Sequence, residues 1–251
     1  MEIRIKSFNG IGDLLFATPT LRRIKEAYPE ARVVVNTNHP ALIEASPFVD
    51  GINEGQDGVF LGYPDPIHRV PPTQHHIVSD WEIVSRAYGL ELEPPELKPE
   101  IYLVGERPRR GPLRYPIGVQ MIHKGHWYSK KVWPEFWALS YLPGFEPIPR
   151  CKTVGELVRV IGSYRAVVCA EGGISHIARA IDVPAVVIYG GFADPAWNGY
   201  EQQVNLCNPL PCSYCYNPDP CVDFVERRCM KEISVEQVET AAVEAAERGA
   251  R

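Results

Sequence analysis

The stretch that decides the fold is residues 166–176, Ala-Val-Val-Cys-Ala-Glu-Gly-Gly-Ile-Ser-His, in which an apolar run leads directly into paired glycines. Ala166–Ala170 predicts a buried strand, and the residues that follow the glycines predict a helix through His176. The next apolar run, Ala185–Tyr189, predicts a second buried strand. Because two strands joined through a helix lie parallel, this segment predicts a parallel sheet.

The beginning of the chain has the same plan. Glu2–Lys6 alternates like a strand and is followed by Gly10-Ile11-Gly12-Asp13. A helical pattern then begins at Leu14 and is closed by Pro29, and Ala31–Val35 predicts the next strand. Alternation of strands and helices at both ends of the chain predicts an α/β protein with parallel sheets.

Further elements follow from the same periodicities. The pattern predicts a strand at Ile117–Ile122 and helices at Asp80–Tyr88, Glu135–Tyr141, Val154–Ile161 and Ser234–Glu247, the last with a capping box of Ser234 and Gln237. Residues 54–78 read as loop, and residues 93–116 as a strand-containing connector between lobes at 1–110 and 111–251. The connector's basic run Arg107, Arg109, Arg110 and Arg114 indicates a solvated surface, with contact to an anionic substrate as the alternative.

Composition excludes several classes of protein. The chain has 251 residues, of which 45% are hydrophobic and 10% aromatic, and its net charge is −5, so it is not expected to be disordered. No apolar run reaches the roughly 18 residues of a membrane helix, and the N-terminus lacks a signal-peptide pattern. The acidic balance disfavours nucleic acid as a partner. We therefore expect a soluble cytoplasmic protein.

The junction Glu171-Gly172-Gly173 carries the strongest chemical signal. Glycines allow a ligand close to the backbone, and the N–H groups and dipole of the helix that follows favour a phosphate or pyrophosphate. His176, in the first turn, could face the same anion. The alternative is a tight strand-to-helix turn that needs glycine for its dihedral angles, with His176 a satisfied surface residue.

Asp13 and Lys131 are the other candidates for chemistry. Asp13 could cap the first helix, but it also follows the first strand at the edge where open α/β sheets place their ligands. Lys131 precedes a helix that Pro134 would start, and a lysine there could pair with phosphate or simply be solvated. Trp133 and Trp137 are interpreted as packing residues.

Five of the seven cysteines gather near the C-terminus, at Cys207, Cys212, Cys215, Cys221 and Cys229. Four thiolates with one Cys-x-x-Cys pair can hold tetrahedral zinc or iron. The pattern therefore predicts a cysteine knuckle over residues 207–229, with Cys212, Cys215, Cys221 and Cys229 as ligands and Cys207 as a further candidate. Free thiols and disulfides are the alternatives, and Cys151 and Cys169 are interpreted as core residues.

Together these pieces resemble glycosyltransferase family 9, the lipopolysaccharide heptosyltransferase family. The motifs that carry the resemblance are Gly10-Ile11-Gly12-Asp13-Leu14-Leu15 with Thr18-Pro19, Leu21-Arg22 and Pro29; Lys131 with Trp133-Pro134; Glu171-Gly172-Gly173-Ile174-Ser175-His176-Ile177-Ala178 with Gly190 and Asp194-Pro195; and Pro211-Cys212-Ser213, Cys215, Cys221 and Cys229-Met230. They occur in family order over nearly the whole chain, which is shorter than a typical member.

The resemblance implies a GT-B fold, in which two Rossmann-like lobes with parallel sheets face a cleft, followed here by the cysteine knuckle and a helix. It implies inverting transfer of a sugar, heptose by default, from a nucleotide-diphosphate sugar such as an ADP-sugar to a glycan, glycolipid or protein acceptor. Asp13 would be the general base. The implied donor-binding residues are Gly12, Lys131, Glu171, Gly172, Gly173, Ser175 and His176. No catalytic metal is expected, so zinc or iron at the cysteines would be structural.

Three other hypotheses for the function remain. A catalytically degenerate member would bind a nucleotide or saccharide without turnover. An epimerase on the same two-lobe plan would need no acceptor, and the cysteines could have a redox role. A hydrolase built on Ser175 and His176 is disfavoured because adjacent residues on a helix do not face each other.

Overall fold

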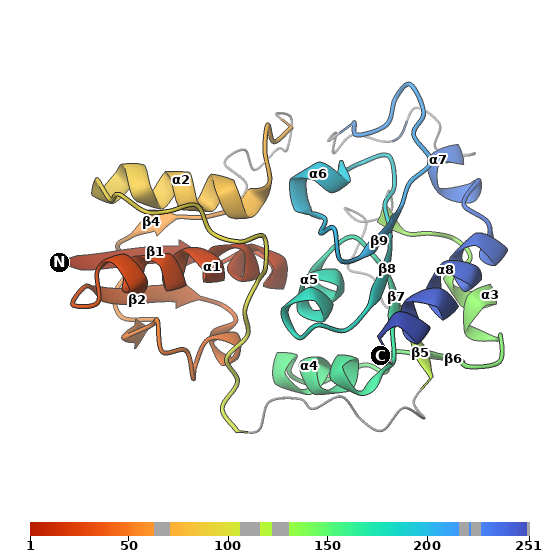
Figure 1. The fold of residues 1–251 in the computed structure, drawn as a ribbon, viewed down its shortest axis with the longest axis horizontal. Coiled ribbons are helices and arrows are strands. Elements are labelled where there is room, and N and C mark those ends of the chain that lie inside the picture. Colours follow the sequence, from red (N-terminus) through yellow and green to blue (C-terminus); the bar gives the residue numbers. More distant parts are fainter. Residues whose placement is uncertain (63–70, 106–115, 122–130, 216–220, 222–226, 250–251) are drawn as a thin grey trace. The chain divides into compact units, whose positions relative to one another are not determined.

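The chain forms two compact α/β units, each with its own parallel sheet (Figure 1). The first unit is Met1–Pro64 with Gln74–Arg107, and the second is Asp65–Thr73 with Pro108–Arg251. The computed structural model describes residues 1–62, 71–105, 116–121, 131–215, 221 and 227–249. Within those residues, no helix is long and apolar enough to cross a membrane.

The first unit contains a four-stranded sheet in the order β3-β2-β1-β4. Its strands are β1 (Glu2–Ser7), β2 (Arg32–Thr37), β3 (Gly51–Ile52) and β4 (Val59–Phe60), and its helices are α1 (Ile11–Ala27), η1 (Pro40–Leu42) and α2 (His76–Tyr88). β1 and β2 pair in parallel from Glu2 opposite Arg32 to Ser7 opposite Thr37. The strand–helix–strand unit predicted at the N-terminus is confirmed.

Both long helices of this unit begin earlier than their sequence patterns predict. α1 begins at Ile11 rather than Leu14, because Asp13 stabilises the start from inside the first turn by accepting a hydrogen bond from the Gly10 N–H at 2.7 Å. α2 begins at His76 rather than Asp80, because the ring of His75 caps it, with Nδ1 accepting from the Ile77 N–H at 3.2 Å. As predicted, Gly89 ends α2 in a left-handed conformation, with φ +61°.

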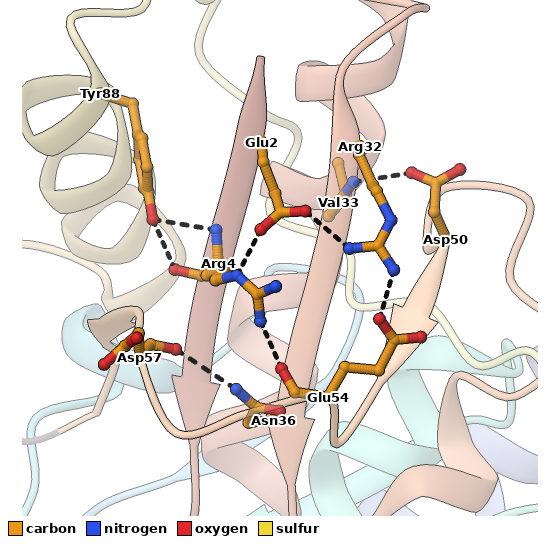
Figure 2. Close-up of polar contacts among 9 residues, drawn as sticks. All are labelled: Glu2, Arg4, Arg32, Val33, Asn36, Asp50, Glu54, Asp57 and Tyr88. Carbon is orange, nitrogen blue, oxygen red and sulfur yellow. Dashed lines mark hydrogen bonds and ion pairs between the residues drawn. The ribbon is translucent and has the colours of Figure 1, made fainter.

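Ionic contacts at the start of β1 and β2 tie the first unit together (Figure 2). Glu2 pairs with Arg4 and with Arg32, and Arg32 also pairs with Glu54 in the loop after β3. Hydrogen bonds from Arg32 and Arg4 lower the pKa of Glu2. The phenol of Tyr88 accepts from the backbone N–H of Arg4 at 2.9 Å and donates to its carbonyl at 2.8 Å, which joins the end of α2 to β1.

The second unit contains a five-stranded sheet in the order β6-β5-β7-β8-β9, with every neighbouring pair parallel. Its strands are β5 (Ile117–Val119), β6 (Phe145–Pro147), β7 (Val167–Ala170), β8 (Ala185–Ile188) and β9 (Val204–Leu206). Its helices are α3 (Phe136–Ser140), α4 (Val154–Ser163), α5 (Gly173–Ala180), α6 (Pro195–Asn198), α7 (Arg228–Lys231) and α8 (Val235–Arg248).

The central strands of the second unit are buried along their whole length. Val168 and Val186 belong to a core cluster with residues of α3 and α8, while α5 packs against the same two strands. Trp133 is fully buried in that cluster, and its indole N–H donates to the Ile233 carbonyl at 2.9 Å. The interpretation of Trp133 as a packing residue is confirmed, but Trp137 is 57% exposed. Trp137 lies on the outer side of the short helix α3.

Several local predictions were wrong. Residues 54–78 are not all loop, since they contain β4 and the first turn of α2. β4 has two residues, too few to produce a periodic signal. Residues 93–105 of the expected connector contain no strand, and Arg107, Arg109, Arg110 and Arg114 lie outside the described residues. β5 ends at Val119, and Ile122 likewise lies outside them.

Candidate functional site

The junction between β7 and α5, Glu171–Gly173, is here called the glycine loop. Gly172 has φ +148°, a conformation that favours glycine, and a side chain there would have no neighbour within 4 Å. Glycine is therefore required for its backbone conformation rather than for lack of space. The hydroxyl of Ser175 donates to the Gly172 carbonyl at 2.7 Å and is 3.4 Å from its N–H. Ser175 thus braces the loop at the start of α5.

The carboxylate of Glu171 is held at both oxygens. Oε2 forms an ion pair with Nζ of Lys131, and Oε1 accepts from Nδ2 of Asn198 at 2.7 Å. Glu171 is 7% exposed and Asn198 is 2% exposed, so these contacts are shielded from water. The Lys131 ammonium also lies 5.1 Å from the ring centroid of Phe192. The fold thus places a lysine, predicted separately from sequence, directly at the glycine loop.

His176 is buried one turn into α5. Its Nδ1 lies 3.0 Å from the hydroxyl of Tyr200, and the two rings meet edge to face with centroids 5.7 Å apart. Burial raises the pKa of Tyr200, so the phenol keeps its proton at neutral pH. The carbonyl of Ser175 accepts from Nε2 of Gln203 at 2.7 Å, which anchors the same turn to the segment before β9.

The predicted donor-binding residues divide between the two units. Lys131 joins the glycine loop through Glu171, and Ser175 and His176 are on the helix that follows, so six of the seven predicted residues belong to the second unit. Gly12 belongs to the first unit, in the first turn of α1. Asn198 and Tyr200 were missed, because nothing in their local sequence distinguishes them from other residues near a short helix.

Asp13 is a buried carboxylate in the first turn of α1, which follows the carboxyl end of β1. It is 8% exposed, and its Oδ2 accepts from the Gly10 N–H. A Cβ on Gly62, just after β4, would lie 3.6 Å from Oδ1 of Asp13. The capping role considered from sequence is present, and the carboxylate also lies at the ligand-binding edge of the sheet.

A second carboxyl, Asp80 on α2, was missed by the sequence analysis. Asp80 is 3% exposed, and burial, followed by the charge of Asp13, raises its pKa well above the usual value. One turn earlier, the ring of His76 stacks on Phe16 of α1 with centroids 5.1 Å apart. The sequence did contain a signal for it, because Asp80 lies at helical spacing from Ile77 and Val84, on the buried face of α2.

The C-terminal cysteines gather beside Gly191. A Cβ on Gly191 would lie 3.2 Å from Sγ of Cys229, and the Cys215 N–H donates to the Gly191 carbonyl at 2.7 Å. Burial raises the pKa of Cys229, and the nearby thiols of Cys221, Cys212 and Cys215 raise it further. Burial also raises the pKa of Cys207, which has a hydrogen bond to Tyr214.

The predicted metal cage is not confirmed. Within the part of the chain that the structure describes, no group of three or more His, Cys, Asp or Glu side chains is placed to hold a metal ion. None of the five cysteines forms a disulfide bond. Of the two cysteines assigned to the core, Cys169 is buried and Cys151 is half-buried.

Comparison with known proteins identifies the sequence around this site. Residues 152–221, which include the glycine loop and α6, match the model of glycosyltransferase family 9 (heptosyltransferase). This segment of the chain therefore resembles glycosyltransferase family 9. The resemblance predicted from the sequence motifs is confirmed.

One curated relative and two solved structures show how far the likeness extends. Lipopolysaccharide heptosyltransferase 1 of Pseudomonas aeruginosa is 33% identical over 70 residues, which is 27% of this chain and 19% of that protein. The match thus spans about a fifth of the relative. The iron-containing dodecameric glycosyltransferase TibC from enterotoxigenic E. coli H10407 has a TM-score of 0.70 at 14% identity, over 98% of this chain and 78% of that one. E. coli heptosyltransferase WaaC with ADP has a TM-score of 0.62 at 13% identity, over 98% of this chain and 100% of that one.

The structural likeness confirms the fold class predicted for this chain. Two α/β units with parallel sheets form the GT-B plan of the heptosyltransferases that it resembles. The family and the relatives are glycosyltransferases.

Proposed function

We propose that this chain is an inverting glycosyltransferase that moves a sugar from a nucleotide-diphosphate sugar to an acceptor hydroxyl. The observation that carries the proposal is the glycine loop, where Gly172 and Gly173 open α5 beside the Lys131–Glu171 ion pair. An ADP-sugar, with heptose as the default sugar, is the proposed donor, since structures similar to this one hold ADP or an ADP-heptose analogue. The acceptor would be a glycan, glycolipid or protein.

In this proposal the second unit binds the donor. The backbone N–H groups of the glycine loop and the positive end of α5 favour the pyrophosphate. As the bond between the anomeric carbon and the diphosphate oxygen breaks, negative charge develops on the departing nucleotide. Lys131 and His176 would stabilise this charge more strongly in the transition state than in the bound substrate.

The first unit would supply the base. The acceptor hydroxyl attacks the anomeric carbon from the face opposite the departing diphosphate, so a single displacement inverts the configuration. Asp13 would take the hydroxyl proton as the new bond forms. Its burial and its hydrogen bond from Gly10 hold the carboxylate in one place, as a general base requires.

The first test separates donor binding from catalysis. ADP, GDP, UDP and CDP are titrated calorimetrically into the wild type, Asp13→Asn and His176→Ala. We expect saturable binding of ADP, unchanged affinity in Asp13→Asn, and weaker affinity in His176→Ala. ADP release from ADP-heptose with an acceptor panel should fall by about 100-fold or more in Asp13→Asn, the magnitude typical of a lost general base.

The same results distinguish the proposed transferase from the alternative hypothesis. Binding of ADP without turnover on any acceptor would favour a catalytically degenerate, nucleotide-binding or saccharide-binding member. If the folded wild type binds none of the four nucleotides, the transferase proposal is wrong. Full turnover by Asp13→Asn would remove Asp13 from the mechanism.

We further propose that Cys212, Cys215, Cys221 and Cys229, with Cys207 as a fifth candidate, bind structural zinc or iron. The thiols of Cys221, Cys212 and Cys215 lie near that of Cys229, which supports this, as does the iron named for the structurally similar TibC. We expect about one metal per chain by elemental analysis of protein purified without chelator, and loss of it in Cys212→Ser/Cys215→Ser. Cys151→Ser is the control. Less than a tenth of an equivalent in the wild type would contradict the proposal.

A further inference from the structure

The Glu171 carboxylate is a buried charge with two partners that come from distant parts of the chain. Lys131 approaches one oxygen from the segment before α3, and Asn198 approaches the other from the end of α6. A charge shielded to this degree is costly unless it is paired and its oxygens receive hydrogen bonds. Without the Asn198 amide, one oxygen would keep no hydrogen bond from the residues that the structure describes.

The Asn198 side chain contributes as a hydrogen-bond donor. Its Nδ2 donates to Glu171 at 2.7 Å, whereas its Oδ1 is buried without a hydrogen-bond partner among the described residues. A buried acceptor left unpaired costs stability. An apolar side chain at position 198 would not bury an unpaired acceptor. We therefore assign the contribution of the amide to its hydrogen bond with Glu171.

The short helix α6 fixes the position of Asn198. Asp194 caps the helix by accepting from the Ala196 N–H at 2.9 Å, and Pro195 begins it. After α6 the chain turns so tightly that a Cβ on Gly199 would lie 2.7 Å from the carbonyl oxygen of Pro195. The turn after Asn198 therefore requires glycine for space, and the amide is aimed by a rigid segment.

We propose that Asn198 is a positioning residue that acts on the donor phosphates through Glu171 and Lys131. The Asn198 amide keeps the Glu171 carboxylate oriented, and this carboxylate holds the Lys131 ammonium at the glycine loop. An ammonium has three donors, so Lys131 can keep Glu171 while it donates to a phosphate oxygen. The inference deepens the proposed function and depends on it, because it assumes that the phosphates bind at this loop.

The test is a double-mutant cycle read out by ADP calorimetry. Asn198→Ala should weaken ADP binding by about 10-fold or more, and Lys131→Ala by at least as much. If Asn198 acts through Lys131, Asn198→Ala should have almost no further effect in the Lys131→Ala background. Asn208→Ala is the matched control, because it also removes an Asn–Glu hydrogen bond of 2.7 Å in the second unit, between Asn208 and Glu232. It should leave ADP affinity unchanged.

A second variant, Asn198→Asp, gives a pH signature that general destabilisation would not produce. While the introduced carboxyl is protonated, it can donate to Glu171 as the amide does. When it ionises, two carboxylates repel each other and the position of Lys131 is lost. The ADP affinity of Asn198→Asp is compared with that of the wild type at each pH. The ratio of variant to wild-type affinity should fall as pH rises from about 5 to 8.

The groups around Glu171 do not obscure this signature. Burial is the main cause that raises the pKa of Cys169, Tyr189 and Tyr200, and Glu171 raises each further, so all three are neutral over this range.

The outcomes distinguish the two proposals. No ADP binding by the wild type would contradict the proposed function itself. Wild-type binding with additive effects of Asn198→Ala and Lys131→Ala, or with a ratio for Asn198→Asp that does not change with pH, would overturn the role of Asn198 alone. Circular dichroism and thermal unfolding of each variant identify any that fails to fold, in which case the pH series on Asn198→Asp decides.

Discussion

Two buried carboxyls in the first unit, Asp13 and Asp80, have different polar surroundings. Asp13 receives a hydrogen bond from the Gly10 N–H and lies in the first turn of the helix that follows β1. Asp80 receives no hydrogen bond from the described residues, and burial and the nearby Asp13 disfavour its charged form. An acid in such an environment binds its proton in the folded protein at pH values where the unfolded chain releases it.

Asp80 should therefore make stability fall as pH rises. Its stabilising contribution is complete below the unfolded pKa of about 4 and is lost progressively up to the raised folded pKa. Asp80→Asn removes the ionisation, so its stability relative to the wild type should increase by up to about 1.4 kcal/mol per pH unit above pH 4. Urea unfolding between pH 4 and 8 measures this difference.

The control for Asp80 is the exposed Asp57, whose change to Asn should give a nearly constant difference across the same pH range. Asp13→Asn should shift the pH dependence of the wild type toward lower pH, because the Asp13 charge contributes to the pKa of Asp80. A stability difference between Asp80→Asn and the wild type that does not change with pH would show that Asp80 ionises normally in the folded state.

At the scale of elements, the C-terminal helix α8 depends on its first turn. The Ser234 hydroxyl accepts from the Gln237 N–H and the Gln237 side chain accepts from the Ser234 N–H, both at 3.1 Å, as the predicted capping box requires. The helix covers the core through Val238, Ala242 and Ala245. Four buried positions on one face give α8 most of its stability, while the cap fixes where it begins.

Ser234→Ala should lower the free energy of unfolding by about 1 kcal/mol, the usual cost of losing an N-cap. Ser140→Ala in the exposed last turn of α3 is the control, since its hydroxyl bonds to the Trp137 carbonyl of its own helix. Chemical denaturation of both variants measures the difference. Equal stability of Ser234→Ala and the wild type would mean that packing alone fixes the start of α8.

For the whole molecule, the division into two units predicts that damage to one core stays local. The cluster that contains Leu139, Val168 and Val238 includes no residue of the first unit. Leu139→Ala should cost the second unit about 2–5 kcal/mol, as expected for a fully buried leucine. Hydrogen exchange should accelerate in β5, β7 and β8 and remain unchanged in β1 and β2. Equal acceleration in β1 and β2 would show that the two units unfold together.

The sequence by itself determined the elements whose signals lie within a few residues. Apolar runs predicted β7 and β8 because both faces of a central parallel strand are buried. The last helix was found from its capping box and the end of α2 from Gly89, since these caps depend on neighbouring residues alone. The family motifs identified the glycine loop and Asp13 in the same way, because each motif is continuous in the chain.

The tertiary structure decided which distant residues meet. The ion pair of Lys131 with Glu171 and the hydrogen bond from Asn198 depend on the path of the chain between them. β4 and the burial of Asp80 were set by packing between elements rather than by local pattern. The cysteine spacing predicts a metal site, but thiols become ligands only when several meet at bonding distance, which spacing alone does not set. Local preference is read within one turn or strand, whereas these contacts arise when segments far apart in the sequence pack together.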